Sequence, residues 1–415
     1  MEKLFSVVGI LSILLLVWIF SSDKKNFPFR IVLWGLAIQF SLAFFVLKFP
    51  LGVQIFSWLG DAVSGFLNNS MKSAEFLFGN AIKPEFFGTF GFQFAIIVAS
   101  TVIFFSAFVS ILYHFGVMQK IVYGMAWFMH KTMGTSGTES LSASANIFLG
   151  QTEAPLLIRH YLNSATLSEL NSIMTVGFAT IAGGVMAAYI SMGVEAKYLI
   201  TASIISAPGG LLLSKILMPP KDKGKSLEEI KNVDIPKSDN VLTAVSQGAT
   251  DGVYLTLNIL GMLIAFIAII AVFDSGLAIL DNWLTTSFGI NFLPSSLKEF
   301  LGYVFQPFAY MVGLTGDDAK TFGSLFGTKI ALNEFIAYTD LSLLIQNNAI
   351  SERTAALASF ALCGFANFSS IAIQIGGIGS LAPDRKVDIS KLGVKAMFVG
   401  ALTNLLTTSI AGLMI

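Results

Sequence analysis

The sequence predicts an all-α polytopic membrane protein with eight transmembrane helices and two opposed re-entrant helical hairpins. Of its 415 residues, 54% are hydrophobic and only 12% are charged, which is far from the composition of soluble domains. Several charge-free runs are long enough to cross a bilayer, which takes about 20 residues. Two further apolar regions carry ionisable residues and are too broken to be simple spans, so we expect them to be the hairpins.

Composition also excludes several classes of function. Lys and Arg total 25, as do Asp and Glu, so the chain has no basic footprint for a nucleic acid. Its one cysteine, Cys363, excludes an intramolecular disulfide, and three scattered histidines complete no metal-ligand pattern. Lysines flank the first apolar run on both sides and no small-residue cleavage site follows it, so we expect a retained helix rather than a signal peptide.

Basic loops between the predicted spans set the orientation. Counting eight spans places every lysine-rich loop on one side, which positive charge assigns to the cytoplasm. Both termini are then expected outside. Two mixed stretches, Leu51–Glu85 and Asp281–Phe300, are expected to be interfacial helices and connectors. The eight spans are Leu4–Phe20, Ile31–Leu47, Phe92–Tyr113, Asn171–Gly193, Tyr198–Leu217, Gly252–Phe273, Thr354–Gly377 and Ala396–Ile415.

The two predicted hairpins are Leu141–Leu162, which contains Glu153, and Phe322–Ile345, which contains Glu334. Each lies between spans that keep their relative orientation, so each should enter and leave the bilayer on the same side. An ionisable residue at that depth is costly and therefore indicates a functional site. Irregular backbone there is tolerated only when it is buried in protein or lines a cavity.

A weak internal repeat supports this arrangement. Each hairpin precedes a span with a Gly-Phe-Ala block, at Gly177 in the first half and Gly364 in the second. The first hairpin enters from inside and the second from outside, which makes the repeat inverted. In secondary transporters, inverted repeats with interrupted helices place the substrate at their interface near the midplane.

The first hairpin offers an amide, a hydroxyl and a carboxylate in Gln151-Thr-Glu153, and Pro155 disfavours helix just beyond them. We expect these groups to line a polar cavity. A structural ion pair between Glu153 and Arg159 is the alternative. Glu334 has a similar alternative partner in Lys329, although a spacing of five residues is not the helical i,i+4 spacing.

Two further polar islands interrupt charge-free spans. Asn367 and Ser370 are three residues apart and would share a helix face, although small polar residues in spans often serve only helix packing. Thr180 precedes Gly183-Gly184, where an unwound turn would expose carbonyl oxygens suited to Na⁺. Asn146 could add a side-chain oxygen, whereas helix packing alone would also explain the glycines.

These patterns predict a secondary transporter for a small substrate, neutral or nearly so, that is rich in hydroxyl or amide groups. A carboxylate can accept both hydrogen bonds of a vicinal diol, which suits a sugar. A membrane-embedded enzyme using two glutamates as acid and base is a second possibility. It would lack a nucleophile with its base. A channel or passive facilitator is a third.

At these segments the sequence resembles the bacterial concentrative nucleoside transporter family. The resemblance covers most of the chain and implies cation-driven nucleoside import across the inner membrane by a homotrimer, coupled to Na⁺ or, in some relatives, to H⁺. It also implies opposed hairpins, a scaffold domain and a moving transport domain. The motifs that carry it are Ser142–Pro155, Ala182–Gly184, Ala207–Gly210, Ala331–Phe335 and Leu362–Ser370.

The resemblance also implies roles for individual residues. Three groups would hold the nucleoside, and a fourth would hold the cation between the first hairpin and the unwound fourth span. The nucleobase would face Gln151, Thr152 and Glu153; the ribose would bind Glu334, Asn367 and Ser370; Val185, Leu255 and Phe365 would pack around both; and Na⁺ would take the Asn146 and Thr180 side chains with the Leu149 and Ile181 carbonyls.

The expected organisation has five parts. They are N-terminal spans and an interfacial helix, mostly scaffold (1–115); a first transport repeat (116–218); a cytoplasmic linker (219–240); a long scaffold span with a connector (241–310); and a second transport repeat (311–415).

Overall fold

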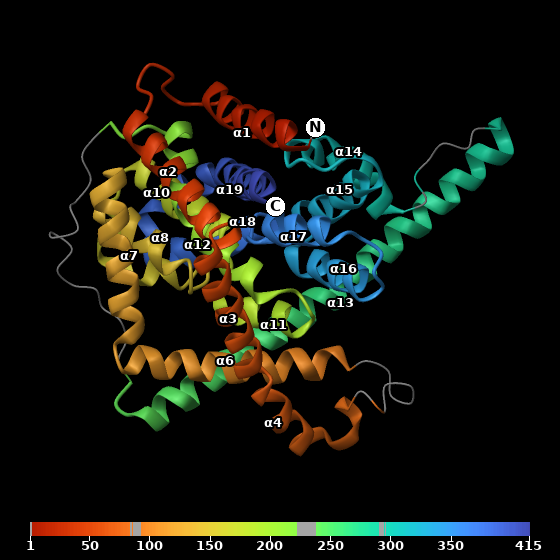
Figure 1. Cartoon of the computed structure of the whole chain (residues 1–415), viewed down its shortest axis with the longest axis horizontal. Helices are drawn as coiled ribbons and strands as arrows, with labels where there is room; N and C mark the ends of the chain where they lie inside the picture. Colours follow the sequence, from red (N-terminus) through yellow and green to blue (C-terminus); the bar gives the residue numbers. More distant parts are fainter. Residues whose placement is uncertain (1, 84, 86–92, 222–237, 290–293, 295) are drawn as a thin grey trace.

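A computed structural model describes residues 2–83, 85, 93–221, 238–289, 294 and 296–415, and this part of the chain is helical without strands (Figure 1). The all-α prediction is confirmed. Most of the predicted linker 219–240 lies outside the described residues. The helices are α1 (Glu2–Ile19), α2 (Phe29–Leu47), α3 (Pro50–Leu67), α4 (Asn69–Phe78), η1 (Gly79–Ile82), α6 (Phe94–His114), α7 (Val117–Met133), α8 (Gly137–Ala145), η3 (Ala154–Ile158), α9 (Arg159–Leu162), α10 (Leu167–Ala179), α11 (Gly183–Ser191), α12 (Ala196–Leu217), α13 (Val241–Phe288), α14 (Leu297–Met311), α15 (Gly316–Ala331), α16 (Glu334–Gln346), α17 (Glu352–Leu362), α18 (Phe368–Leu381), η4 (Pro383–Arg385) and α19 (Lys386–Met414).

Seven helical segments of the described chain are long and apolar enough to cross a membrane. They correspond to seven of the eight predicted spans. The eighth, Thr354–Gly377, consists of two shorter helices, α17 and α18, separated by a non-helical break. A span interrupted in this way is tolerated only where neighbouring protein groups satisfy the freed backbone.

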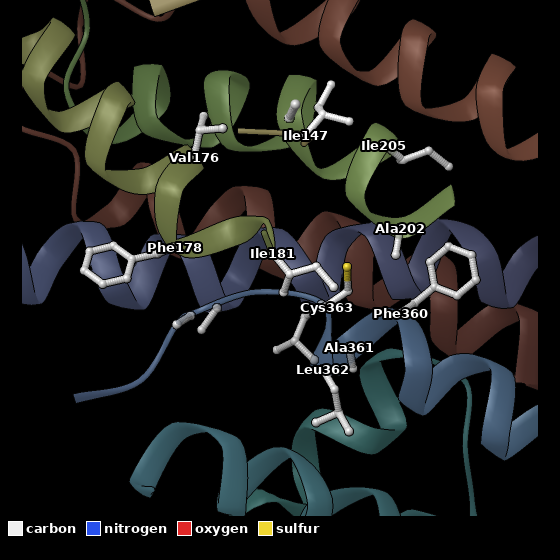
Figure 2. Close-up of a cluster of buried hydrophobic side chains, with 14 of the residues drawn as sticks. Ile147, Val176, Phe178, Ile181, Ala202, Ile205, Phe360, Ala361, Leu362 and Cys363 are labelled. Atoms are coloured by element: carbon white, nitrogen blue, oxygen red, sulfur yellow. The ribbon is translucent and has the colours of Figure 1, made fainter. Parts of the chain in front are cut away.

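A second interruption divides the predicted span Asn171–Gly193. Helix α10 ends at Ala179 and α11 begins at Gly183, so Thr180 lies in the break with extended backbone angles. The first interruption follows the Gly-Phe-Ala block at Gly177, whereas the block at Gly364 lies inside the second interruption. Side chains from both breaks belong to one apolar cluster, in which Ile181 lies near Cys363 (Figure 2).

Both predicted hairpin regions also contain a break in their helix. In the first, α8 ends at Ala145 and the chain returns through η3 and α9. In the second, α15 packs against α16, and Asn333 lies between them. Asn333 caps α16, because its side-chain oxygen accepts a hydrogen bond from the Ile336 amide at 2.9 Å. That these regions re-enter the bilayer stays a prediction.

Helix α13 is much longer than the predicted span Gly252–Phe273. It has 48 residues and absorbs the first part of the stretch that we expected to be a connector, which was therefore partly wrong. Its first half packs along α6, where a Cβ on Gly252 would lie 2.6 Å from the Ile103 Cα. Its second half projects beyond the other labelled helices (Figure 1).

Helix α2 packs against α12 and α19 in the interior. The buried Gln39 amide donates to the Ile205 carbonyl at 3.1 Å and to the Thr407 hydroxyl at 3.3 Å. These bonds connect the predicted span Ile31–Leu47 to α12 and α19, one in each predicted transport repeat. They therefore favour movement of α2 together with α12 and α19.

Candidate functional site

A carboxylate and an amide form the polar centre where α16 and α18 begin. Glu334 is only 6% exposed, and its Oε2 accepts a hydrogen bond from Asn367 Nδ2 at 2.8 Å. Asn367 caps α18, because its Oδ1 accepts from the Ser370 amide at 2.8 Å. We had expected Asn367 and Ser370 to share a helix face. This was wrong, because Asn367 precedes the helix. The two residues are adjacent because one caps the helix of the other.

Aromatic rings enclose one side of Glu334. The Tyr189 hydroxyl donates to Glu334 Oε1 at 3.4 Å. Tyr189 stacks on Tyr338 with ring centroids 4.0 Å apart, and Phe335 meets Tyr189 edge-on at 5.2 Å. These rings exclude water from one face of the carboxylate. Hydrogen bonds to its other lone pairs are strengthened in such a low-dielectric setting.

The tip of the first hairpin contacts the second repeat directly. Gln151 Oε1 accepts a hydrogen bond from Gln374 Nε2 at 2.9 Å, which joins the hairpin to α18. A Cβ on Gly377 would lie 2.6 Å from Thr152 Cγ2, so α18 approaches this tip closely. Glu153 is exposed, whereas Glu334 is buried. The two carboxylates therefore have different surroundings.

The three predicted apolar residues come from three separate elements. Val185 is buried in α11, and Leu255 is half-buried in α13. Phe365 lies in the break before α18, where its amide donates to the Thr180 carbonyl at 3.3 Å. A Cβ on Gly184 would lie 3.1 Å from Leu255 Cδ2, so α11 and α13 are in close contact.

The predicted cation ligands lie in two neighbouring breaks. The Gly183 amide donates to the Phe148 carbonyl at 2.9 Å, which joins the first hairpin tip to the break between α10 and α11. Asn146 Oδ1 is buried and has no hydrogen-bond donor among the described residues. The Thr180 hydroxyl donates to the Val176 carbonyl at 2.9 Å and keeps its own lone pairs available. Oxygen groups of this kind suit a hard cation, so the donor set fits Na⁺.

The structure does not support Lys329 as an ion-pair partner for Glu334. Lys329 Nζ donates to the Ala361 carbonyl at 2.8 Å and to Asn404 Oδ1 at 2.6 Å. Arg159 Nε donates a hydrogen bond to His160 Nε2 at 3.3 Å, and the pairing of Arg159 with Glu153 stays a prediction. Glu334 therefore has polar rather than charged hydrogen-bonding partners in the described chain.

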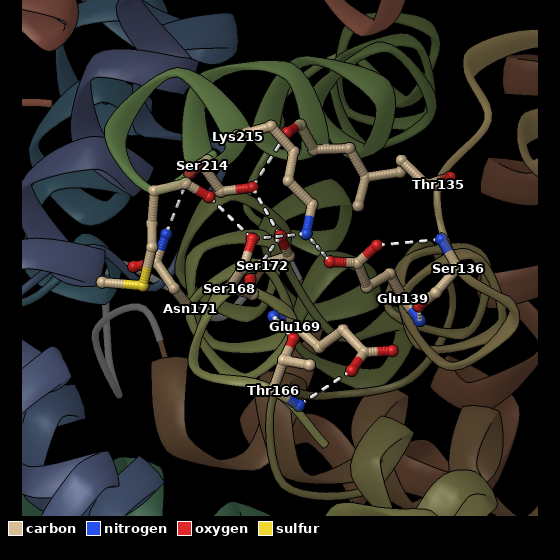
Figure 3. Close-up of polar contacts among 12 residues, drawn as sticks. Thr135, Ser136, Glu139, Thr166, Ser168, Glu169, Asn171, Ser172, Ser214 and Lys215 are labelled. Carbon is tan, nitrogen blue, oxygen red and sulfur yellow. Dashed lines mark hydrogen bonds and ion pairs between the residues drawn. The ribbon is translucent and has the colours of Figure 1, made fainter. Parts of the chain in front are cut away.

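A buried ion pair fixes the base of the first hairpin (Figure 3). Lys215 on α12 pairs with Glu139 on α8, and both side chains are 2% exposed. Lys215 Nζ also donates to the Ser168 hydroxyl at 2.8 Å. Removing one member of such a pair leaves an uncompensated buried charge and costs about 3–5 kcal/mol. The hairpin is thereby held to α10 and α12.

Sequence reasoning missed several of these residues. Tyr189 was hidden among aromatic residues that most often pack in a core. Gln374 was detectable, because it is an amide in a charge-free span. Asn404 carries the same signal, but the roles of Asn404 and Lys215 depend on contacts between helices far apart in sequence, which no local pattern shows.

Known proteins resemble this chain over its whole length. Three family descriptions match: Na⁺ dependent nucleoside transporter N-terminus over residues 8–81, nucleoside recognition gate over 95–196, and Na⁺ dependent nucleoside transporter C-terminus over 198–412. An uncharacterized transporter of Haemophilus influenzae is 41% identical over 419 residues, covering 100% of this chain and 98% of that protein.

Sodium/nucleoside cotransporter 1 of Rattus norvegicus is 40% identical, but this chain, matched over its full length, covers only 64% of that protein. Among solved structures, CNTnw in an inward-facing substrate-bound state matches with a TM-score of 0.93 and 37% identity, covering 100% of this chain and 98% of that one. An outward-facing CNTnw variant matches with a TM-score of 0.94 at the same identity and coverage.

Proposed function

Because this chain belongs to the Na⁺-dependent, or concentrative, nucleoside transporter family, we propose that it imports nucleosides such as uridine, cytidine or adenosine by cation-coupled symport. The observation that carries this proposal is the buried Glu334–Asn367 pair where two half-helices begin. It leaves carboxylate lone pairs available for hydroxyl donors in a water-poor site. A ribose presents two such donors on neighbouring carbons.

The proposed nucleoside site has a sugar end and a base end. Glu334, Asn367 and Ser370 bind the ribose hydroxyls. Gln151, Thr152 and Glu153 face the base, partly through water. The exposure of Glu153 supports this division, since a base-binding carboxylate needs access to ligand and water. Val185, Leu255 and Phe365 pack around the base and the ribose.

The coupling cation is Na⁺ in this proposal. It binds the side chains of Asn146 and Thr180 and the carbonyls of Leu149 and Ile181. The buried Asn146 Oδ1 without a donor supports it, because such a group costs about 1–3 kcal/mol unless something satisfies it. The cation also stabilises the junction between the hairpin tip and the α10–α11 break, which orders the base end of the nucleoside site.

Alternating access requires one part of the chain to move against another. We assign the hairpins and the interrupted helices to the moving part, and α3, α6 and α13 to the scaffold. Residues 116–218 and 311–415 supply the two transport repeats, 219–240 links them to the scaffold span, and 241–310 holds α13 and its connector. The hydrogen bonds of the buried Gln39 favour movement of α2 together with the repeats. The scaffold within residues 1–115 is therefore smaller than the sequence suggested, because it leaves out α2.

A homotrimer in the bacterial inner membrane, with both termini periplasmic, completes the proposal. The outer half of α13 supports self-association. It carries large apolar side chains that no described helix covers, and Val272 and Ile279 are each 72% exposed. Apolar faces in a bilayer contact either lipid or another protein. Crosslinking in native membranes followed by mass determination tests the trimer.

Uptake of radiolabelled uridine into proteoliposomes tests the function. With an imposed Na⁺ gradient we expect accumulation above equilibrium, and unchanged uridine inside. Equilibration without accumulation would indicate a facilitator, and altered uridine would indicate an enzyme. A proton gradient in place of Na⁺ identifies H⁺ coupling. Failure to accumulate under either gradient would reject the symporter.

A further inference from the structure

Lys329 is a charged residue that the proposed nucleoside and cation sites leave without a role. It lies in the last turn of α15 and its side chain is fully buried. In the part of the chain that the structure describes, no carboxylate forms an ion pair with it. A buried lysine is costly unless its ammonium group is well solvated by protein. Its surroundings therefore need an explanation.

The Lys329 amine has two oxygen acceptors, one at the end of the interrupted helix α17 and one on the continuous helix α19. It donates to the Ala361 carbonyl, in the last turn of α17, at 2.8 Å and to Asn404 Oδ1 at 2.6 Å. The ring of Phe326 lies 5.7 Å from Nζ and adds a weak cation–π contact. Carbonyl and amide oxygens are the groups that would also coordinate a hard cation.

Asn404 extends this contact to both repeats. Its Nδ2 donates to the Ala179 carbonyl, at the end of α10, at 2.7 Å and to the Cys363 carbonyl, at the end of α17, at 2.6 Å. The C-terminal end of a helix carries roughly half a negative elementary charge, and two such ends converge here. These helix ends therefore favour a positive charge at Lys329 and offset part of the desolvation cost of its burial.

Each predicted repeat thus has a positive charge at the end of its interrupted helix. In the first repeat, the predicted mobile cation lies at Thr180 and Ile181, immediately beyond the end of α10. In the second, the amine of Lys329 lies at the end of α17. The first break orders the base end of the proposed nucleoside site, and the second break supplies Phe365 and Asn367 to that site.

We propose that Lys329 is a tethered cation, whose ammonium group does in the second repeat what the mobile cation does in the first. It positions the α17–α18 break, and through that break Asn367 and Glu334. Lys329 is a positioning residue, because it contacts neither substrate nor mobile cation. This inference rests on the proposed function, since nucleoside binding is its readout.

Chemical rescue tests the charge directly. Lys329→Ala removes the equivalent of propylamine from the core, whereas Lys329→Met fills most of the space without a charge. We expect both variants to bind radiolabelled uridine roughly tenfold or more weakly at a fixed Na⁺ concentration, because buried acceptors lose a charged donor. Propylammonium should restore binding to the Ala variant but not to the Met variant. 1-Propanol, which fills the space without charge, should restore neither.

Two results would overturn the inference. One is wild-type affinity in both variants, and the other is equal rescue of Lys329→Ala by 1-propanol and propylammonium. If the Ala variant is not recovered as monodisperse protein, Lys329→Arg and Lys329→Met decide the question. Lys329→Arg should keep the uridine affinity within about threefold of wild type, whereas Lys329→Met should lose it. Equal affinities of these two variants would reject a role for the positive charge. A wild-type protein that binds no nucleoside under any cation would instead reject the proposed function.

Discussion

Glu334 differs from the residues of an ordinary transmembrane helix, because it is an ionisable group held by hydrogen bonds inside the protein. Glu334 is buried with two neutral partners, Asn367 and Tyr189. A carboxylate in this position accepts further hydrogen bonds and donates none while it is ionised. That property, rather than charge attraction, suits it to a neutral ligand with hydroxyl groups.

Replacing Glu334 with Gln tests this property. The amide keeps the shape but converts one acceptor to a donor, so it cannot accept two ribose hydroxyls. Hydrogen bonds to charged groups contribute about 1.5–3 kcal/mol each, so we expect uridine affinity to fall by about a hundredfold or more. Equilibrium binding to purified protein measures this.

Glu352→Gln is the matched control, because Glu352 is an exposed carboxylate in the first turn of α17. It should bind uridine like wild type. Wild-type affinity in Glu334→Gln would refute the ribose role of Glu334.

Thr180 tests the cation site at the same scale. Thr180→Ala removes a hydroxyl oxygen from the break after α10, while Thr180→Ser keeps it. We expect the Na⁺ concentration for half-maximal uptake to rise roughly tenfold in the Ala variant, as for loss of one ligand to a charge. The rate at saturating Na⁺ should change less. Unaltered Na⁺ dependence of uridine uptake in the Ala variant would count against this site.

At the scale of elements, the two interrupted helices depend on close backbone approach. Gly364 follows the end of α17, and a Cβ there would lie 2.5 Å from Asn404 Oδ1 and 2.7 Å from the Phe178 carbonyl. Any side chain would push the two breaks apart. The glycines after Thr180 indicated the first break, whereas the span that contains Gly364 was expected to be continuous. The contact with α19 was not predictable either, because Asn404 lies 40 residues beyond Gly364.

We therefore expect Gly364→Ala to lower uridine uptake by roughly tenfold or more, since overpacking of this kind costs about 1–3 kcal/mol. Gly376→Ala is the control, because a Cβ at that position in α18 would meet nothing within 4 Å. The control should transport normally in the same proteoliposome assay. Equal uptake by the two variants would show that the close approach is dispensable.

At the scale of the whole molecule, the proposed mechanism requires the predicted hairpins to move against the proposed scaffold. Phe335 on α16 meets Phe94 on α6 with ring centroids 6.0 Å apart, so an element of the proposed moving part contacts one of the proposed scaffold. Phe66 on α3 meets Phe104 on α6 at 4.7 Å, and both belong to the proposed scaffold. These two contacts offer a matched pair for crosslinking.

Cysteines at positions 94 and 335, joined by a short reducible crosslinker, should block uridine uptake, because alternating access requires this contact to change. Reduction should restore uptake. The same treatment at 66 and 104 should leave transport intact. Both proteins need Cys363→Ala, which removes the one native cysteine. Full transport with the 94–335 crosslink in place would contradict the proposed movement.

The sequence by itself determined the membrane class, the helical fold and where polar residues interrupt apolar segments, because hydropathy and the cost of buried charge act locally along the chain. Only the tertiary structure decided that Asn367 is a helix cap, that α13 continues to Phe288, and that Gln39 joins α2 to the repeats. It also gave Lys329 its acceptors. Hydrogen-bond partners far apart in sequence leave no periodic pattern, so their pairing appears only when the helices have packed.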